Sequence, residues 1–172
     1  MARLPAIQHL NGLDEAAAQA ALAPLFEGAP RFVVRLLGQR PYSSWDELLD
    51  RAGSVAGRMP DEELVELINS HPRIGASPGG LSALSYREQG YDRGDGSAQL
   101  AAQLERLNTA YEQRFGFRFV IFVAGRPRAE IAPIIEQRLA ASRDEEKQRA
   151  VGDILAIARD RLSKLSATEE GP

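Results

Sequence analysis

Residues 98–115 read AQLAAQLERLNTAYEQRF, and this stretch decides the fold class. Its large apolar side chains recur at spacings of four, three, four and four: Leu100, Leu104, Leu107, Tyr111 and Phe115. That spacing places them on one face of a helix, whereas a half-buried strand would need an alternation of two. The stretch therefore predicts a long amphipathic helix that buries one face.

Helix signals continue in both directions from this stretch. Before it, residues 13–26 are rich in Ala and Leu, and Pro30 opens an apolar segment at 32–37. A capping box follows at 44–47, and a Pro-Asp-Glu-Glu helix start at 60–63. After it, they cover residues 127–141 and a last amphipathic segment from Val151 to Leu165. We predict an all-α fold, a single-domain helical bundle over residues 1–166 with a disordered tail at 167–172.

Two segments break the helical pattern. Residues 72–97 contain Pro72, Pro78 and several glycines, which predict a long irregular loop. Long loops inside compact domains are uncommon and are often functional. Residues 117–123 (FRFVIFV) are aromatic and β-branched, which indicates either a buried strand or an extended buried segment.

Composition excludes several kinds of function. The net charge of -3 gives no electrostatic footprint for nucleic acid or an acidic membrane surface. No segment is apolar over a length that could span a bilayer, and no signal peptide is evident, so we expect a cytoplasmic protein.

The chemistry open to the chain is also narrow. The sequence has no cysteine, only two histidines (His9 and His71) and only two lysines (Lys147 and Lys164), both among polar neighbours. These numbers leave no thiolate chemistry, no multi-histidine metal site within one chain and no desolvated Schiff-base lysine. We therefore expect no metal and no cofactor, and chemistry from histidine, carboxylates, arginine, hydroxyls and backbone.

His71 is the first candidate catalytic residue. A lone histidine is more often a surface or capping residue. Here, however, Pro72 fixes the backbone at the point where a helix gives way to the long loop, so His71 can be held rigidly toward a pocket. His9 has no such setting and is interpreted as a structural or surface residue.

Two further segments are candidates for binding. Ser85 and Glu88 have capping-box spacing, which favours a helix start; alternatively, residues 85–89 (SYREQ) present a hydroxyl, a carboxylate and an amide that could orient a histidine and hold a polar heterocycle. Residues 115–121 (FGFRFVI) are either core, or an extended segment whose backbone binds a flat ureide-like ligand while the aromatic rings exclude water.

Together the motifs resemble a known family. They are His71-Pro72-Arg73-Ile74-Gly75, Ser85-x-x-Glu88-Gln89, Leu107-Asn108 with Tyr111, Phe115-Gly116-Phe117-x-Phe119, Arg138-Leu139 and a final Arg161-Leu162. In this order they resemble the 2-oxo-4-hydroxy-4-carboxy-5-ureidoimidazoline (OHCU) decarboxylases over roughly residues 5–166. Arg118, where a proline is frequent, and the glycine-rich residues 76–80 depart from the pattern but remove no chemical group.

The resemblance implies an all-helical bundle, a homodimer, a small ureide substrate and (S)-allantoin as product. It implies that His71 is the catalytic acid or base, and we expect Glu88 to orient its imidazole. The expected substrate-binding residues are Pro72, Ser85, Tyr86, Arg87, Gln89, Phe119, Val120, Ile121, Phe122, Val123 and Arg138. No cofactor is needed, because a ring C=N bond beside the departing carboxylate can accept the electron pair.

Two other functions stay open from the sequence. One is a non-catalytic helical interaction module. The other is a decarboxylase or hydrolase that acts on another small ureide.

Overall fold

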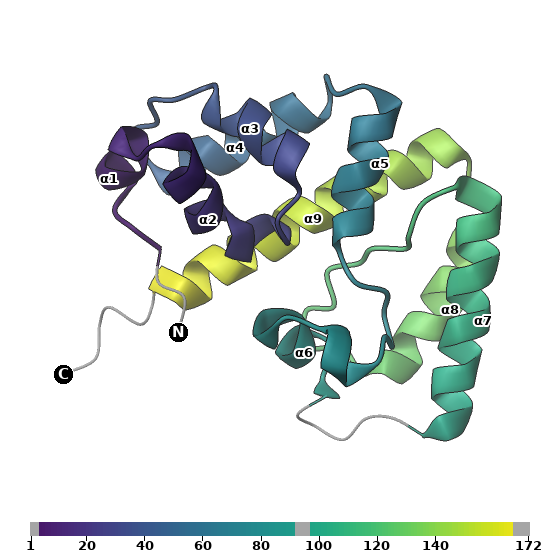
Figure 1. The fold of residues 1–172 in the computed structure, drawn as a ribbon. Helices are drawn as coiled ribbons and strands as arrows, with labels where there is room; N and C mark the ends of the chain where they lie inside the picture. The colour runs from purple at the N-terminus through teal and green to yellow at the C-terminus, as the bar shows by residue number, and fades with distance from the viewer. Residues whose placement is uncertain (1–3, 92–96, 167–172) are drawn as a thin grey trace. The chain divides into compact units, whose positions relative to one another are not determined.

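The computed structural model describes residues 4–91 and 97–166. Within these ranges it forms nine α-helices and one 3-10 helix, and no strand (Figure 1). The chain divides into two compact units: unit 1, Met1–Ser70 with Ile154–Pro172, and unit 2, His71–Asp153. The predicted all-α class is confirmed.

Unit 1 is organised around a short central helix. Its helices are α1 (Ile7–Gly12), α2 (Glu15–Phe26), α3 (Pro30–Leu37), α4 (Trp45–Ala56) and α5 (Asp61–Ser70). Helices α2, α4 and α5 all pack against α3, which buries Phe32, Val33, Leu36 and Leu37 and leaves Val34 exposed. The rings of Phe26 and Phe32 meet edge to face with centroids 5.0 Å apart, in the arrangement that aromatic quadrupoles favour.

Side-chain caps fix where two of these helices begin. Asp14 accepts a hydrogen bond from the N–H of Ala17 over 2.8 Å at the start of α2. Ser44 accepts one from the N–H of Glu47 over 3.1 Å at the start of α4, as the predicted capping box requires. Such caps satisfy backbone donors that a helix start otherwise leaves unpaired.

The end of α9 (Arg143–Ser166) is anchored in unit 1 by a buried arginine. Arg161 is 1% exposed. It donates to the carbonyl of Pro24 over 2.9 Å and to Oε1 of Glu27 over 2.7 Å. The guanidinium is therefore buried together with a carboxylate partner, which the cost of burying a charge demands.

Unit 2 carries the candidate site. Its elements are the 3-10 helix η1 (Pro78–Gly80), α6 (Ala83–Glu88), α7 (Ala98–Phe115), α8 (Arg128–Arg138) and the first part of α9. Helices α7 and α8 pack side by side (Figure 1). Against α7 lies an aromatic cluster in which the ring of Tyr111 is 4.5, 6.0 and 5.2 Å from the rings of Phe115, Phe117 and Phe119.

The segment from Phe117 to Val123 is the part of the chain between α7 and α8 that brings this cluster together. It is extended, and it is buried at Phe117 and Phe119, which are 1% and 0% exposed. No β-ladder includes it in the described part of the chain, so it is not a strand. Of the two structures predicted for it, the extended buried segment is the one observed.

Other predictions need correction. The short helix α1 was not predicted, because its six residues are too few to show a period. The capping box predicted at Ser85 is wrong: α6 begins at Ala83, and Ser82 is the cap that accepts from the N–H of Ser85 over 3.1 Å. The predicted long loop is thus interrupted by η1 and α6, while its residues 92–96 and the predicted tail at 167–172 lie outside the described residues.

None of the helices in the described ranges combines the length and the apolar character that a bilayer crossing requires.

Candidate active site

His71 is buried at the start of unit 2, directly after the last residue of α5. It is 2% exposed, and its backbone carbonyl accepts a hydrogen bond from Nη1 of Arg118 over 3.1 Å. Pro72 follows and is half-buried. The backbone that follows the imidazole is therefore constrained by the proline ring and by a guanidinium. His9, by contrast, is exposed, as predicted for a surface residue.

Three consecutive residues of the loop after His71 are held by side chains from two other elements. Gln89 donates through Nε2 to the carbonyl of Arg73 over 3.0 Å and accepts through Oε1 from the N–H of Gly75 over 2.9 Å. Buried Asn108 of α7 donates through Nδ2 to the carbonyl of Ile74 over 2.9 Å. These bonds fix the path of the loop, because each otherwise unpaired backbone group gains a rigid partner.

An ion pair adds a further anchor on the same loop. The guanidinium of Arg73 donates through Nε and Nη2 to the two carboxylate oxygens of Glu112, over 2.7 and 2.5 Å. It also reaches Glu105 over 2.8 Å. Hydrogen bonding to Glu112 raises the pKa of Arg73, and this two-pronged geometry is the stronger form of the Arg–carboxylate pair.

Helix α6 divides the predicted residues 85–89 between two environments. Ser85 and Gln89 are buried at 2% and 4% exposure, and Glu88 is half-buried. Tyr86 and Arg87 are exposed, and the ring of Tyr86 stacks on that of Tyr91 with centroids 5.4 Å apart. The helical period therefore turns the hydroxyl and the amide inward and the two larger side chains outward.

The extended segment from Phe119 to Val123 is bound to α9 at one point. The N–H of Phe122 donates to Oδ1 of Asp153 over 3.0 Å, and the carbonyl of Phe122 accepts from Nη2 of Arg126 over 2.5 Å. At Val120 and Ile121, which are 4% and 6% exposed, no hydrogen bond joins the backbone to another residue in the described part of the chain. Most buried backbone groups in proteins have a partner, which can be ordered water or a ligand.

Arg138 lies beside this segment in a network of buried charges. Its Nε donates to Oε2 of Glu146 over 2.8 Å and its Nη1 to Oδ2 of Asp153 over 3.3 Å. The guanidinium lies 4.8 Å from the centroid of the Phe119 ring. Its Nη2 is buried and meets no hydrogen-bond acceptor among the described residues.

The hydroxyl of Tyr111 completes this network. It donates to the same Oε2 of Glu146 over 2.6 Å, and burial together with the nearby carboxylate raises the pKa of Tyr111. The phenol therefore stays protonated and serves as a fixed donor to Glu146. Glu146 itself is fully buried, at 0% exposure.

All of the predicted site residues belong to unit 2, and contacts link several of them. Gln89 binds the loop that begins at His71, and Arg118, in the segment that follows α7, binds the carbonyl of His71. The same segment meets Arg138 at the ring of Phe119, and Asp153 of α9 binds both Arg138 and the segment. Tyr86 and Arg87 point away, into solvent. The partnership of Glu88 with His71 stays a prediction, as do the roles of the individual residues.

Four residues that hold this arrangement were not predicted: Asn108, Arg118, Glu146 and Asp153. For two of them the sequence contains a usable signal. Asn108 lies between Leu104 and Tyr111 on the buried face of α7, and Glu146 lies four residues before buried Ala150 on that of α9. A polar residue on an apolar face is expected to have a specific partner.

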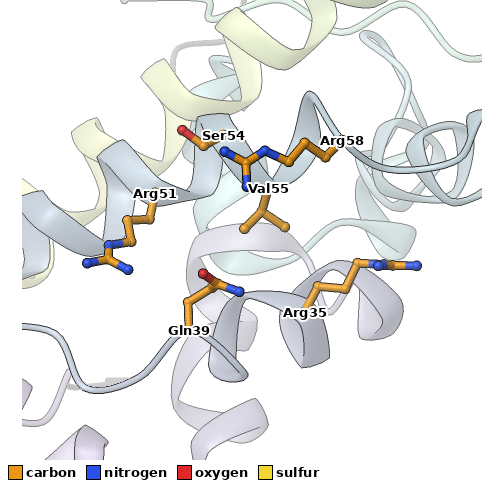
Figure 2. Close-up of a pocket in the computed structure, with 6 residues that line it drawn as sticks. All are labelled: Arg35, Gln39, Arg51, Ser54, Val55 and Arg58. Carbon is orange, nitrogen blue, oxygen red and sulfur yellow. The ribbon is translucent and has the colours of Figure 1, made fainter.

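A groove in unit 1 contains none of these residues. It has a volume of about 570 Å³ and is lined by Arg35, Gln39, Arg51, Ser54, Val55 and Arg58. Figure 2 shows these side chains on α3, α4 and the residues just after them. Arg35 and Arg51 already pair with Glu63 and Glu47, so the groove is a solvated, partly neutralised surface.

The fold of the chain matches that of two solved structures. The crystal structure of OHCU decarboxylase in the presence of (S)-allantoin superposes with a TM-score of 0.68 at 22% identity, and covers 85% of this chain and 96% of that one. The crystal structure of (S)-allantoin synthase gives a TM-score of 0.68 at 16% identity, and covers 94% and 54%. These structures define the class of the fold.

Sequence comparison then gives the family. The family model described as OHCU decarboxylase matches residues 11–163, so the chain belongs to the OHCU decarboxylase family, whose named members are carboxy-lyases. The 2-oxo-4-hydroxy-4-carboxy-5-ureidoimidazoline decarboxylase of Haloferax volcanii is 30% identical over 95% of this chain and 97% of its own length. The uric acid degradation bifunctional protein PucL of Bacillus subtilis is 32% identical over 94% of this chain, which spans only 33% of that protein.

Proposed function

We propose that this chain decarboxylates 2-oxo-4-hydroxy-4-carboxy-5-ureidoimidazoline to (S)-allantoin in urate degradation, without a cofactor. The proposal is carried by the setting of His71, which is buried and whose carbonyl is bound by Arg118. The chain that holds it belongs to the OHCU decarboxylase family. A histidine fixed in this way can exchange a proton with a ligand without first reorganising.

The reaction needs only proton management and a site that holds the ring. The bond from the ring carbon to the carboxylate breaks, and its electron pair moves toward the neighbouring C=N bond, whose nitrogen takes up a proton. The hydroxyl on the first carbon then loses its proton and becomes a carbonyl, while the second ring carbon gains a proton on one face. Carbon dioxide leaves, and one proton is consumed overall.

In this proposal His71 hydrogen-bonds the substrate hydroxyl and carries out the proton transfer, and Glu88 orients the imidazole or favours its charged form. Ser85, Gln89 and the backbone of residues 119–123 hold the ureido and ring amides. The unpaired backbone groups of Val120 and Ile121 support this role, since a flat ureide offers both donors and acceptors.

Arg138 supplies charge complementarity to the carboxylate before it leaves. The buried Nη2 of Arg138 supports this role, because it has no acceptor among the described residues while the other guanidinium nitrogens pair with Glu146 and Asp153. The ion pairs fix the direction of the guanidinium, so it can meet a carboxylate at low entropic cost.

We propose, from the same family resemblance, that the chain forms a homodimer. Light scattering coupled to size-exclusion chromatography tests this, and a monomer at all protein concentrations would contradict it. A cytoplasmic location stays a prediction from the sequence.

The activity is tested by circular dichroism. The unstable intermediate is generated in place by enzymatic oxidation and hydration of urate, the purified chain is added, and the signal of optically active allantoin is followed. We expect (S)-allantoin to form faster than by spontaneous decay. Racemic product at the spontaneous rate would overturn the proposal and favour a non-catalytic helical module or another ureide substrate.

A further inference from the structure

Unit 2 contains a hollow lined by residues that the proposed reaction does not use. Its volume is about 400 Å³. It lies between the loop that follows His71, Tyr91, the start of α7 and the first residue of α8. The lining residues are Gly75, Ala76, Ser77, Pro78, Tyr91, Ser97, Ala98, Leu100, Ala101, Leu104 and Arg128. We refer to it as the Arg128 pocket.

Arg128 is the single charged residue among the described residues that line the pocket. It is 8% exposed, and its guanidinium lies over the ring of Tyr91, 4.2 Å from the centroid. No hydrogen bond or ion pair joins the guanidinium to any residue in the described ranges, and its Nε is fully enclosed. A buried charge is costly unless it is paired, and the described residues supply no counter-ion for this guanidinium.

The helix ends at the pocket make the local potential more positive. Arg128 is the first residue of α8, where the helix dipole is positive and a cation is disfavoured. The 18-residue helix α7 also begins at the pocket: Ser97 caps the N–H of Leu100 over 3.1 Å, and this single bond satisfies one of the four donors of the first turn. No aspartate or glutamate belongs to the described lining.

From the buried guanidinium and the α7 helix start that face one hollow, we propose that the Arg128 pocket binds a small aliphatic carboxylate. The planar guanidinium offers parallel N–H donors that match two carboxylate oxygens, and its stacking on Tyr91 holds the fork in place. Leu100, Leu104 and Pro78 line the same space and would contact a short hydrocarbon body.

The occupant of this pocket would contact the backbone that leads from His71. Gly75 and Ala76 line the pocket. The N–H of Gly75 donates to Gln89 of the candidate site, and the carbonyl of Ala76 accepts from the hydroxyl of Tyr91. The binding claim does not depend on the proposed function, since binding is measured without turnover.

The test is saturation-transfer difference NMR on the full chain with butyrate as the probe, at constant ionic strength set with sodium chloride. We expect saturable transfer to butyrate. In Arg128→Gln the dissociation constant should rise at least about tenfold, the range that loss of a charge-assisted pair produces. Arg106→Gln removes the same charge from an exposed position on α7 and should bind as the wild type does.

A second variant keeps the test decisive if Arg128→Gln does not fold. Ala101→Phe fills space in the pocket from an exposed position and leaves the guanidinium intact, so it should also weaken butyrate binding. Wild-type affinity in both variants, or no saturable binding to the wild-type chain, would overturn the proposal. Displacement of butyrate by equimolar phosphate would overturn the preference for a carboxylate, and equal displacement by chloride would overturn the site.

Discussion

Nε of Arg138 donates to Oε2 of Glu146 over 2.8 Å in an ion pair whose side chains are 10% and 0% exposed. Glu146 is shared, because Tyr111 donates to the same oxygen and Arg149 to the other, over 2.6 Å each. The carboxylate thus has a partner for each oxygen, which makes its burial tolerable. The arginine predicted to meet the substrate is consequently held by a residue that cannot itself reach solvent.

Replacement of Glu146 by glutamine should destabilise the fold. The amide cannot neutralise Arg138, and removal of one member of a buried pair costs about 3 kcal/mol or more. The free energy of unfolding is measured by urea denaturation. Arg149→Gln is the matched control, because Arg149 meets the same carboxylate from an exposed position and its loss should cost much less. Equal losses in the two variants would contradict the central place of Glu146.

Replacement of Asp153 by asparagine should weaken substrate binding more than it weakens the fold. Asparagine keeps an acceptor for the N–H of Phe122, but it removes the charge that faces Nη1 of Arg138. We expect KM to rise by about tenfold with kcat changed less, because Asp153 acts by positioning Arg138.

The control for this variant is Asp160→Asn, at a carboxylate that pairs with Lys164 on the surface of α9. It should leave KM unchanged. If Asp153→Asn has the KM of the wild type, Asp153 has no positioning role.

Gly75 should not tolerate alanine. Its φ is +80°, in the region that disfavours residues with a side chain, and a Cβ there would lie 3.1 Å from Cδ1 of Leu104. We expect Gly75→Ala to lose about 1–2 kcal/mol of stability by thermal or urea unfolding. Gly79→Ala, four residues along the same loop, meets nothing within 4 Å and should be near neutral. Equal effects at the two positions would show that the loop is not held as described.

Stability should fall in alkali, partly through Tyr42. Burial raises the pKa of Tyr42 to about 12, and its hydroxyl donates to the carbonyl of Leu36 over 2.5 Å. Because the folded pKa is above the unfolded value near 10, the stabilisation is complete below about pH 10 and is lost as pH rises toward about 12. Urea midpoints measured across this interval should fall less steeply for Tyr42→Phe. An unchanged slope would refute the assignment.

The helices were largely predictable because their signals are local. The apolar spacing in residues 98–115 and the cap at Ser44 depend on residues within a few turns, and both gave the observed elements α7 and α4. The start of α6 was misplaced because Ser82 and Ser85 both offer a capping hydroxyl, and the sequence does not tell which one the backbone uses.

The site could be predicted only in part, since its supports join residues far apart in the sequence. Gln89 was predicted as a substrate contact, but its amide also holds the backbone at Arg73 and Gly75. Arg118 was noted as a departure from the family pattern, and the structure places its guanidinium on the carbonyl of His71, 47 residues away. Contacts of this kind follow from the packed fold and have no local pattern.

A stereospecific assay of His71→Ala against His9→Ala shows whether His71 carries the reaction, because the two variants remove in turn the two histidines of the chain. Formation of (S)-allantoin is followed by circular dichroism, and folding by urea denaturation. We expect His71→Ala to fold and to lose about a hundredfold or more of the enzymatic acceleration, while His9→Ala, at an exposed position, keeps the wild-type rate. Near-normal formation of (S)-allantoin by folded His71→Ala would contradict a catalytic role for His71.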